Sequence, residues 1–362
     1  MSKLLIVAPY PEKRAPSQRF RFEQYIDLMR DTGVEVRVVS FWSDRHWPAI
    51  YRKGQLPLKI YATIEGFLRR FLLLFVLARY DAILVHREAT PIGWPWWEWA
   101  AAKIWGKILI YDFDDAVWLS NSSSSNARLV GGLKNHGKTA KIISWSQRVF
   151  AGNAFLAAYA RQFSGRVDVV PTTIDTAHLH NRVKKHTATK LPMIGWTGTH
   201  STLKQLMPLM PLLEKLHQTI PFKFLLIADQ VPDALPDFVN FKPWNKSTEI
   251  DDLLQLDIGI MPLFDTDWER GKCGFKALQY MALGIPSVVS DVGVNAEIVD
   301  DGVNGFLCEA MPLSNSVLWE KALTALLTDH ALRASLGAAG RNTIIEKYSV
   351  KSQTPFYLSL VS

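Results

Sequence analysis

The sequence alternates short apolar runs with longer amphipathic stretches, and it does so in two successive series. Leu4–Tyr10 and Val34–Trp42 are typical of buried strands. Between them, Arg19–Arg30 has apolar residues at near-helical spacing, and Gly33 follows where a helix C-terminal glycine is expected. Repetition of strand, helix and strand predicts parallel sheets in an α/β layer fold. The other expected strands are Ala82–Val85, Ile108–Tyr111, Arg148–Ala151 and Val167–Val170 in the first series, and Met193–Trp196, Phe222–Ala228, Val239–Phe241, Ile258–Met261, Pro286–Ser290 and Gly305–Leu307 in the second.

A polar segment, Asn181–Lys190, separates the two series and is interpreted as a linker. The chain has 362 residues, more than the roughly 250–300 at which a single hydrophobic core stops growing. We therefore expect one domain over residues 1–185 and a second over residues 186–345, with a helix over Ala331–Tyr348. The polar and aromatic tail, residues 346–362, is expected to pack back toward the first domain.

The net charge of +7 is concentrated in the first half of the chain. Residues 1–180 hold 24 Lys and Arg against 15 Asp and Glu, or +9, and residues 181–362 hold 17 against 19, or −2. A basic face on the first domain suits anionic lipid, a phosphorylated substrate or nucleic acid. Nucleic acid is the weakest of these, because the aromatic residues are not interleaved with basic ones in a recognised module. The two cysteines, Cys273 and Cys308, exclude a disulfide framework and fit a reducing compartment.

Two apolar segments bear on membrane contact. The unbroken apolar run within Phe67–Tyr80 is only Phe71–Ala78, too short to cross a bilayer. It forms either a buried helix of the first domain or an interfacial helix with Arg69, Arg70 and Arg79 at lipid headgroups.

The second segment, Pro91–Trp105, holds five of the thirteen tryptophans. It is either aromatic packing on a helix that begins at Pro95 or a membrane-interface contact. The amino terminus is too short in apolar residues for a secretory signal and is interpreted as a first strand. Ser120–Asn126 is expected to be a mobile loop.

A loop rich in glycine and lysine follows the expected strand Ile258–Met261. Gly271 and Gly274 would let backbone amides approach a ligand closely, and a helix starting near Gly274 would direct unpaired N–H groups at an anion. Lys272 and Lys276 add positive charges four residues apart. The segment is either a diphosphate cradle or a solvated loop.

The run that follows, Tyr280–Val289 (YMALGIPSVV), resembles the donor-binding region of retaining glycosyltransferases of family 4, which have two Rossmann-like domains facing a central cleft (the GT-B fold). In that family, two Glu residues separated by seven others surround a glycine–Phe–glycine loop just before this run. Here Gln279 occupies the second Glu position, and Gly271 the first. Glu269 lies two residues earlier and is the candidate to replace it. A Gln can hydrogen-bond ribose hydroxyls without charge.

Other segments extend the resemblance over about 300 residues. Ile194–Leu206 resembles the strand and loop that open the donor domain, and Gly293–Val299 resembles the family's Gly-x-x-Glu helix start. Val169–Leu179 is similar to the segment before the linker, with Thr172 and Thr173 in place of Asn-Gly. The resemblance implies these donor-binding residues: Gly198, Thr199, Lys204, Glu269, Lys272, Gly274, Phe275, Lys276, Gln279 and Glu297.

Three loops of the first domain follow strands, where ligands of open α/β sheets bind. The first carries arginines that suit phosphate or carboxylate contacts but also fit a solvated helix face. The second brings His86, Arg87 and Glu88 together at a strand end, where a His is either part of a site or structural. The acceptor-binding candidates are Arg14, Ser17, Arg19, Arg21 and Arg87.

The third loop carries Asp112, Asp114 and Asp115. These carboxylates can position an acceptor hydroxyl or take its proton. They can also bind a divalent metal or cap a helix. Family 4 enzymes generally work without an essential metal, so the resemblance implies neither a metal nor another cofactor.

The resemblance implies an enzyme that moves a sugar from a nucleoside-diphosphate sugar to a hydroxyl of a glycan or lipid-linked acceptor, with retention. Asp114, His86 and Lys276 are the catalytic candidates. The expected setting is synthesis of cell-surface polysaccharide such as lipopolysaccharide, in the cytoplasm or on an anionic inner membrane face, without nucleic acid. The alternative is a non-catalytic peripheral membrane or polyanion-binding protein with the same fold.

Overall fold

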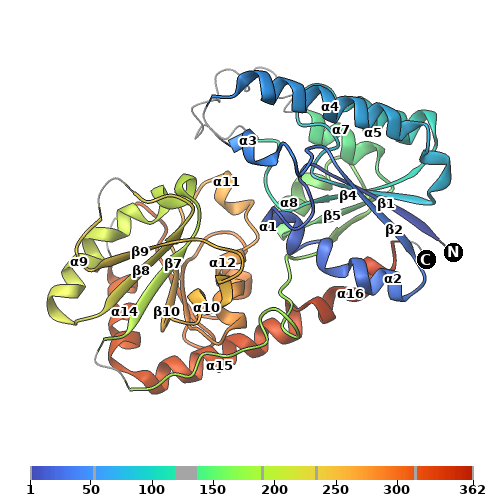
Figure 1. The fold of residues 1–362 in the computed structure, drawn as a ribbon. Coiled ribbons are helices and arrows are strands. Elements are labelled where there is room, and N and C mark those ends of the chain that lie inside the picture. Colours follow the sequence, from blue (N-terminus) through green and yellow to red (C-terminus); the bar gives the residue numbers. More distant parts are fainter. Residues whose placement is uncertain are drawn as a thin grey trace. The chain divides into compact units, whose positions relative to one another are not determined.

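The chain forms two compact units in a computed structural model, which describes residues 2–51, 54–119, 137–188, 191–232, 235–313 and 316–360 (Figure 1). The first unit comprises Met1–Thr172 and Gln353–Ser362, and the second comprises Thr173–Ser352. Each contains one six-stranded sheet in which every pairing is parallel. The α/β prediction is therefore confirmed. The expected loop Ser120–Asn126 lies outside the described residues.

The boundary lies about 13 residues earlier than expected, at residue 172 instead of near residue 185. The segment interpreted as a linker is bonded into the second unit: the amide of Lys184 donates to the carbonyl of Leu283 at 2.8 Å, and Nε2 of His186 lies 2.8 Å from the carbonyl oxygen of Gly284. Polar composition alone does not reveal such backbone contacts.

The first sheet has the order β2-β1-β3-β4-β5-β6. Its central strands are buried along almost their whole length, as parallel strands covered on both faces must be. All six strands occur where the sequence predicts them. They are β1 (Lys3–Ala8), β2 (Glu35–Ser40), β3 (Ala82–His86), β4 (Ile108–Phe113), β5 (Arg148–Ala151) and β6 (Val167–Val169).

The helices of the first unit include one long helix, α4 (Leu56–Leu74), among many short ones. The predicted single helix Arg19–Arg30 is wrong. Phe20, Arg21 and Phe22 are all buried, and three consecutive residues cannot share one face of a surface helix. The other helices are α1 (Pro16–Arg19), η1 (Glu23–Tyr25), α2 (Ile26–Asp31), α3 (Trp47–Tyr51), η2 (Leu77–Arg79), α5 (Trp96–Trp99), η3 (Ala100–Ile104), α7 (Lys138–Trp145) and α8 (Ala154–Ala160).

The second sheet has the order β12-β11-β10-β7-β8-β9. Its six strands also occur where the sequence predicts them: β7 (Met193–Thr197), β8 (Lys223–Ala228), β9 (Val239–Pro243), β10 (Ile258–Met261), β11 (Ser287–Ser290) and β12 (Phe306–Cys308). The helices are η4 (His200–Gln205), η5 (Met207–Leu209), α9 (Met210–Thr219), α10 (Glu249–Leu253), α11 (Asp267–Arg270), α12 (Phe275–Ala282), α13 (Asn295–Ile298), α14 (Val317–Thr328) and α15 (His330–Lys347).

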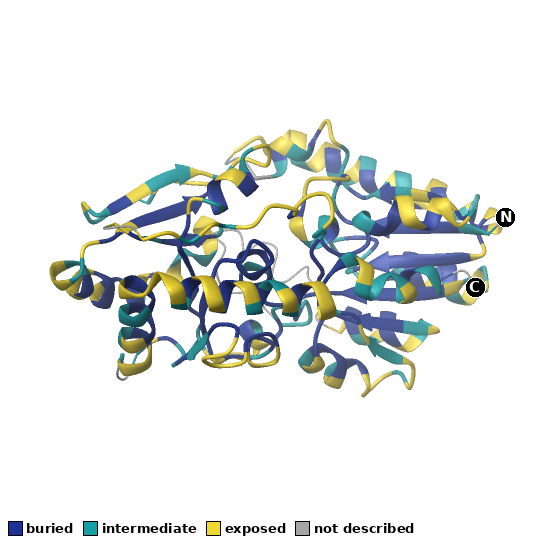
Figure 2. Ribbon diagram, turned by 90° about the horizontal axis from the view of Figure 1, so that it is seen from below, coloured by how far each residue is buried: buried dark blue, intermediate teal, exposed yellow. Residues whose placement is uncertain are grey.

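The end of the chain is divided between the units. Helix α16 (Val350–Leu358) starts in the second unit and ends in the first, where the ring of Tyr357 stacks on that of Tyr25 with centroids 3.9 Å apart. Apolar side chains from both faces of each sheet form the cores, and the helices keep exposed outer faces, shown yellow in Figure 2. No helix in the described parts of the chain combines the length and apolarity that crossing a membrane requires.

Candidate functional site

The strand order of the second unit places two loops at a ligand-binding position. Between β7 and β10 the chain order of the strands reverses, and open α/β sheets bind ligands beyond the carboxyl ends of strands at such a point. Gly198 and Thr199 directly follow β7, whereas Glu269 and Lys272 lie in the segment between β10 and α12. Topology therefore brings together loops that are about 70 residues apart in the sequence.

Lys276, Trp196 and Gly198 are in contact at this position. The ammonium nitrogen of Lys276 lies 5.3 Å from the centre of the Trp196 ring. A Cβ added to Gly198 would stand 2.2 Å from the same ring, so glycine is required there. The indole Nε1 of Trp196 is buried without a hydrogen-bond partner in the described protein, although buried donors are almost always paired.

The electrostatics of Lys276 are unusual. Burial, with a contribution from the nearby Lys272, lowers its pKa to about 7. Within the described residues, Lys276 pairs with no carboxylate and its charge faces only the Trp196 ring. A cation that lacks a counter-ion in a low-dielectric site favours a bound anion.

The loop before α12 needs a glycine at one point. Gly274 has φ +65°, and an added Cβ there would stand 2.4 Å from Ile298. Helix α12 begins at Phe275, so Lys276 is in its first turn, near the positive end of the helix. Lys272 lies in the preceding loop, with its ammonium 6.0 Å from the centre of the Trp268 ring, and does not share a helical turn with Lys276.

Glu269 is buried, and both of its carboxylate oxygens accept hydrogen bonds. Nε2 of Gln205 donates to it at 3.1 Å, and the hydroxyl of Thr266 donates to the other oxygen. Its carboxylate thereby ties the loop after β10 to η4, the helix that carries Lys204. Lys204 itself is exposed, and the neighbouring Thr199 caps η4 through Thr202.

Gln279 does not reach the surface of the loop. It is 2% exposed, and its Nε2 donates to Oε1 of Glu249 at 3.3 Å. The indole of Trp244 donates to the same oxygen at 3.3 Å. A carboxylate therefore does stand beside Gln279, but α10 supplies it and not α12.

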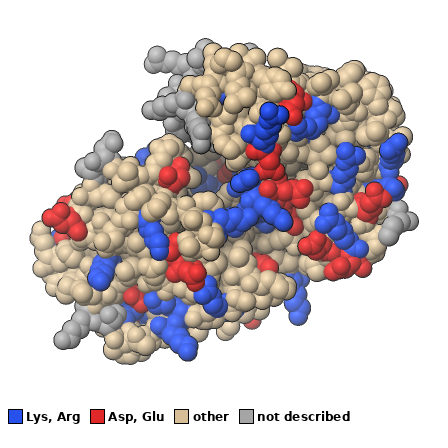
Figure 3. Space-filling model, in the orientation of Figure 1, with Lys and Arg blue, Asp and Glu red and all other residues tan. Residues whose placement is uncertain are grey.

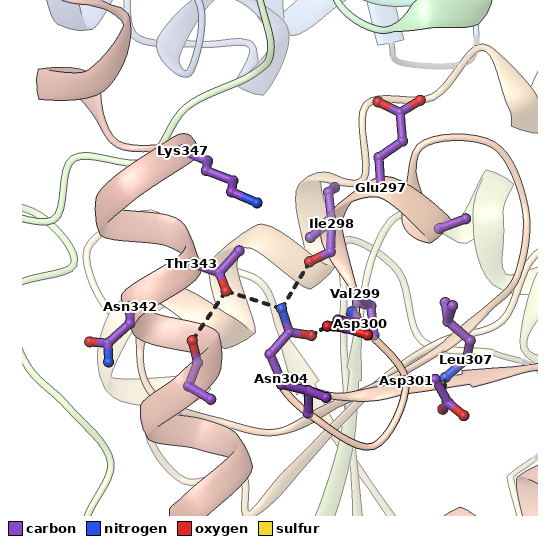
Figure 4. Close-up of a pocket in the computed structure, with 13 residues that line it drawn as sticks. Glu297, Ile298, Val299, Asp300, Asp301, Asn304, Leu307, Asn342, Thr343 and Lys347 are labelled. Carbon is purple, nitrogen blue, oxygen red and sulfur yellow. Dashed lines mark hydrogen bonds between the residues drawn. The ribbon is translucent and has the colours of Figure 1, made fainter.

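Glu297 lies on α13, next to Ile298, the side chain that stands nearest to Gly274. It is exposed on α13 at the rim of a pocket of about 600 Å³ between α13 and α15 (Figure 4). In this pocket Asn304 donates to the carbonyl of Ile298 and to Thr343, and Glu297 points away from it. The pocket lining includes neither Lys272 nor Lys276.

The first unit has a reversal of the same kind between β1 and β3. At this edge Asp112 is the centre of a fully buried cluster. Arg21 pairs with its carboxylate and also donates to the carbonyl of Val170 at 2.5 Å, while Nδ1 of His86 lies 2.6 Å from Oδ2 of Asp112. Burial alone would raise the pKa of Asp112, but Arg21 and His86 hold it at about 2.

Arg87 holds the other two carboxylates of this edge. Its Nε donates to Oδ1 of Asp114 at 2.7 Å, and its Nη2 donates to Asp115. Despite burial, Arg87 lowers the pKa of Asp114, which makes that carboxylate a weak base. Arg87 has φ +58°, a backbone conformation that is costly for a side chain of this size.

His86 is fully buried, and its two ring nitrogens differ in their contacts. Because the ionised carboxylate of Asp112 can only accept hydrogen bonds, Nδ1 of His86 carries a proton. Nε2 lies 4.0 Å from Oδ1 of Asp114, and no described group hydrogen-bonds it. The catalytic candidates His86 and Asp114 are therefore brought together at this edge.

The acceptor-binding candidates are not all at the surface. Arg21 is fully buried and pairs with Asp112, so the prediction that it contacts an acceptor is wrong. Arg14 is exposed and pairs with Asp44 at 3.0 Å, and Ser17 and Arg19 are half-buried on α1.

Glu88 pairs with Lys138 at 2.7 Å. Over the described residues, no group of three or more His, Cys, Asp or Glu is arranged to hold a metal ion. The Asp112, Asp114 and Asp115 carboxylates face Arg21 and Arg87 instead.

Two residues of these sites were missed by sequence reasoning, and a third was named without its role. Trp196 and Glu249 are buried polar groups whose role depends on contacts with α12, and Asp112 was expected only as one of three equal carboxylates. The signal for Asp112 was its position as a charged residue inside an otherwise apolar strand, since β4 extends to Phe113.

Comparison with known proteins bears on both units. Residues 191–329 match the family model described as "Glycosyl transferases group 1". Human alpha-1,3/1,6-mannosyltransferase ALG2 is 32% identical over 81 residues, a match that spans 22% of this chain and only 18% of that protein.

Solved structures are similar along almost the whole chain. Sucrose-phosphate synthase from Thermosynechococcus elongatus has a TM-score of 0.72 at 14% identity, covering 99% of this chain and 98% of its own. Anabaena Alr3699/HepE in complex with UDP and glucose has a TM-score of 0.62 at 16% identity, covering 99% of each chain. The chain therefore has the GT-B fold, and the match of residues 191–329 to the group 1 model supports the expected transferase enzyme.

Proposed function

We propose that the protein is a retaining family 4 glycosyltransferase that takes its sugar from a nucleoside-diphosphate sugar bound in the second unit. The observation that carries this is the unpaired Lys276 ammonium over Trp196, next to an unpartnered indole N–H. A diphosphate placed there supplies the counter-ion and the hydrogen-bond acceptor that these groups lack. The Anabaena relative was solved with UDP, which supports a nucleotide donor.

Lys276 and the start of α12 stabilise charge on the leaving diphosphate. As the bond between sugar and phosphate breaks, negative charge builds on the phosphate oxygens, and a preorganised cation in a site that excludes water lowers the barrier. Lys272, Gly274 and Gly198 complete the diphosphate contacts in this proposal. Glu249 holds the ribose hydroxyls in this proposal, and Gln279 positions its carboxylate.

The first unit binds the acceptor through the edge that carries His86. Nε2 of His86 accepts a hydrogen bond from the attacking hydroxyl, and Asp112 keeps the imidazole in the required tautomer. Arg87 fixes Asp114 and Asp115 around it. Because Arg21 and Arg87 already pair with the three carboxylates, the proposed transfer uses neither a metal ion nor another cofactor.

The proposed acceptor is a lipid-linked glycan, and the setting is synthesis of cell-surface polysaccharide on the inner face of the cytoplasmic membrane. The excess of nine positive charges in residues 1–180 supports work at an anionic surface. The fold match to a lipopolysaccharide outer core galactosyltransferase, at 11% identity, is in keeping with this setting.

A thermal-shift screen against UDP, GDP, ADP and TDP, followed by donor hydrolysis assays, tests the proposal. We expect one nucleotide to stabilise the native protein and Lys276→Met to abolish that stabilisation. Lys223→Met is the matched control, because Lys223 starts β8 at the opposite end of the sheet and is exposed. Equal stabilisation of the Lys276→Met variant and the native protein would place the nucleotide elsewhere.

A further inference from the structure

Helix α4 buries an arginine and exposes a row of apolar side chains, unlike an ordinary surface helix. Its inward face carries Ala62, Gly66 and Arg70, and Gly66 is so close to the ring of Phe41 that an added Cβ would stand 2.6 Å from it. Arg70 is 0% exposed and donates to the carbonyls of Ala89, Val39 and Ala8. One charged side chain of this helix, Arg70, is therefore inside the unit, where it donates to backbone carbonyls.

The outward face of α4 is apolar. We call this face the α4 stripe: Leu56, Ile60, Ile64, Leu68, Phe71 and Phe75, which recur every three or four residues and are each at least 51% exposed. In Figure 3 the surface over α4 is mainly tan, with few charged atoms. The stripe presents on the order of 600 Å² of apolar surface, the upper end of what monomeric proteins expose.

We propose that the α4 stripe is the surface by which this protein inserts into the interface of a lipid bilayer, and that burial of its apolar side chains is sufficient to hold it there. This inference rests on the proposed function at a membrane and assigns the contact to one helix. An in-plane helix of about 28 Å, at 1.5 Å per residue, places such a stripe along the headgroup boundary.

The chemistry of the stripe favours lipid over a protein partner. A protein interface carries about one hydrogen bond per 100–200 Å², whereas acyl chains require none. Among the exposed side chains of α4, Tyr61 alone has a polar atom. The remaining charged side chains of α4, Lys59, Glu65 and Arg69, are half-buried and do not oppose insertion, and Arg69 donates to Glu65 at 2.6 Å. No acidic side chain belongs to the stripe.

The neighbouring helix supplies interfacial aromatic residues. The indole of Trp97 donates to the carbonyl of Arg70 at 2.9 Å, which fixes α5 against α4. Trp97 is buried, but Trp94 and Trp99 are each 38% exposed, with ring centroids 5.8 Å apart. The tryptophan-rich segment thus both packs inside the unit and presents rings of the kind that favour the membrane–water boundary. Arg70, however, is not available to headgroups, so the expectation for that arginine is wrong.

Vesicle flotation of the full chain tests the proposal. On pure phosphatidylcholine vesicles we expect binding that persists in about 1 M salt, where the Debye length falls to about 3 Å. Ile64→Glu with Phe71→Glu should lower the partition coefficient at least a hundredfold. Val317→Glu is the matched control, because Val317 is equally exposed in the second unit and should leave partitioning unchanged.

Each other outcome overturns the inference. Binding only to anionic vesicles and only in low salt would assign the contact to basic residues. Loss of a dimer in the double variant, with no vesicle binding by the native chain, would make the stripe a contact between copies. Nucleotide stabilisation, measured on the same variants, reports the proposed function separately and also shows that they are folded.

Discussion

The pH dependence of donor binding is the sharpest consequence of the Lys276 environment. Its pKa of about 7, against an ordinary value of 10.5, means that holding the ammonium charged in the free protein costs about 5 kcal/mol relative to water. A diphosphate beside the ammonium offsets that cost and raises the pKa again. Binding above pH 7 must therefore take up a proton.

The magnitude follows from the same pKa. At pH 8 only about one tenth of the free protein carries a proton on Lys276, so binding should take up close to one proton. The affinity for a nucleoside diphosphate should fall about tenfold per pH unit above 7 and level off below about pH 6. Above pH 7 the terminal phosphate itself is already ionised, since its second pKa is near 6.

Stability should change in the opposite direction to affinity. The unfolded chain binds the Lys276 proton up to about pH 10.5, whereas the folded chain releases it near pH 7. Between these values the unfolded state holds more protons, so the contribution of this group to the free energy of unfolding rises with pH.

Isothermal titration calorimetry at pH 8 measures the proton uptake directly. Two buffers with different ionisation enthalpies give apparent binding enthalpies whose difference reports the protons taken up. Lys276→Met should bind more weakly and show no uptake, whereas Lys223→Met should behave as the native chain does. Tight binding by the native protein without proton uptake would refute the assignment of the diphosphate to Lys276.

Three further predictions concern the first unit. Asp112→Asn leaves Arg21 buried without its counter-ion, so the free energy of unfolding in urea should fall by about 3–5 kcal/mol. Asp112→Leu combined with Arg21→Met should recover most of that loss. Although burial opposes it, Arg21 and His86 hold the pKa of Asp112 near 2, below the ordinary 3.8, so the stabilisation is present above about pH 4 and is lost as pH falls toward 2; an acid titration of Asp112→Asn should lack this transition. Gly66→Ala should lower Tm because its Cβ meets the Phe41 ring at 2.6 Å, and adding Phe41→Leu should restore part of the loss; an unchanged Tm in Gly66→Ala would contradict the close packing of α4.

The twelve strands were predictable because each is an apolar run that a covered parallel sheet requires. Ala82–Val85, for example, is observed as Ala82–His86. The loops after β7 and β10 were predictable as a site because they join a strand end to a helix start. The contact of Lys276 with Trp196 was not, because it depends on how α12 lies across the end of β7, a tertiary arrangement with no local pattern.

The buried arginines show why the remaining contacts could not be predicted from the sequence. From the sequence alone, Arg21 and Arg70 would be expected at the surface, because charged side chains are rarely buried. In the structure both are buried, and each donates to acceptors on distant segments. Asp112 lies 91 positions from Arg21, and the carbonyl that Arg70 reaches in β1 lies 62 positions away. Periodicity shows which face of a helix is apolar, but it does not show that a charged residue such as Arg70 is buried.

The discontinuous first unit has a consequence for biosynthesis. Residues Gln353–Ser362 belong to this unit although the whole of Thr173–Ser352 precedes them. A ribosome therefore completes the second unit before it releases the segment in which Tyr357 covers Tyr25. Until then the Tyr25 ring of the nascent first unit stays uncovered. The unit that is synthesised first is therefore the last to complete its folding.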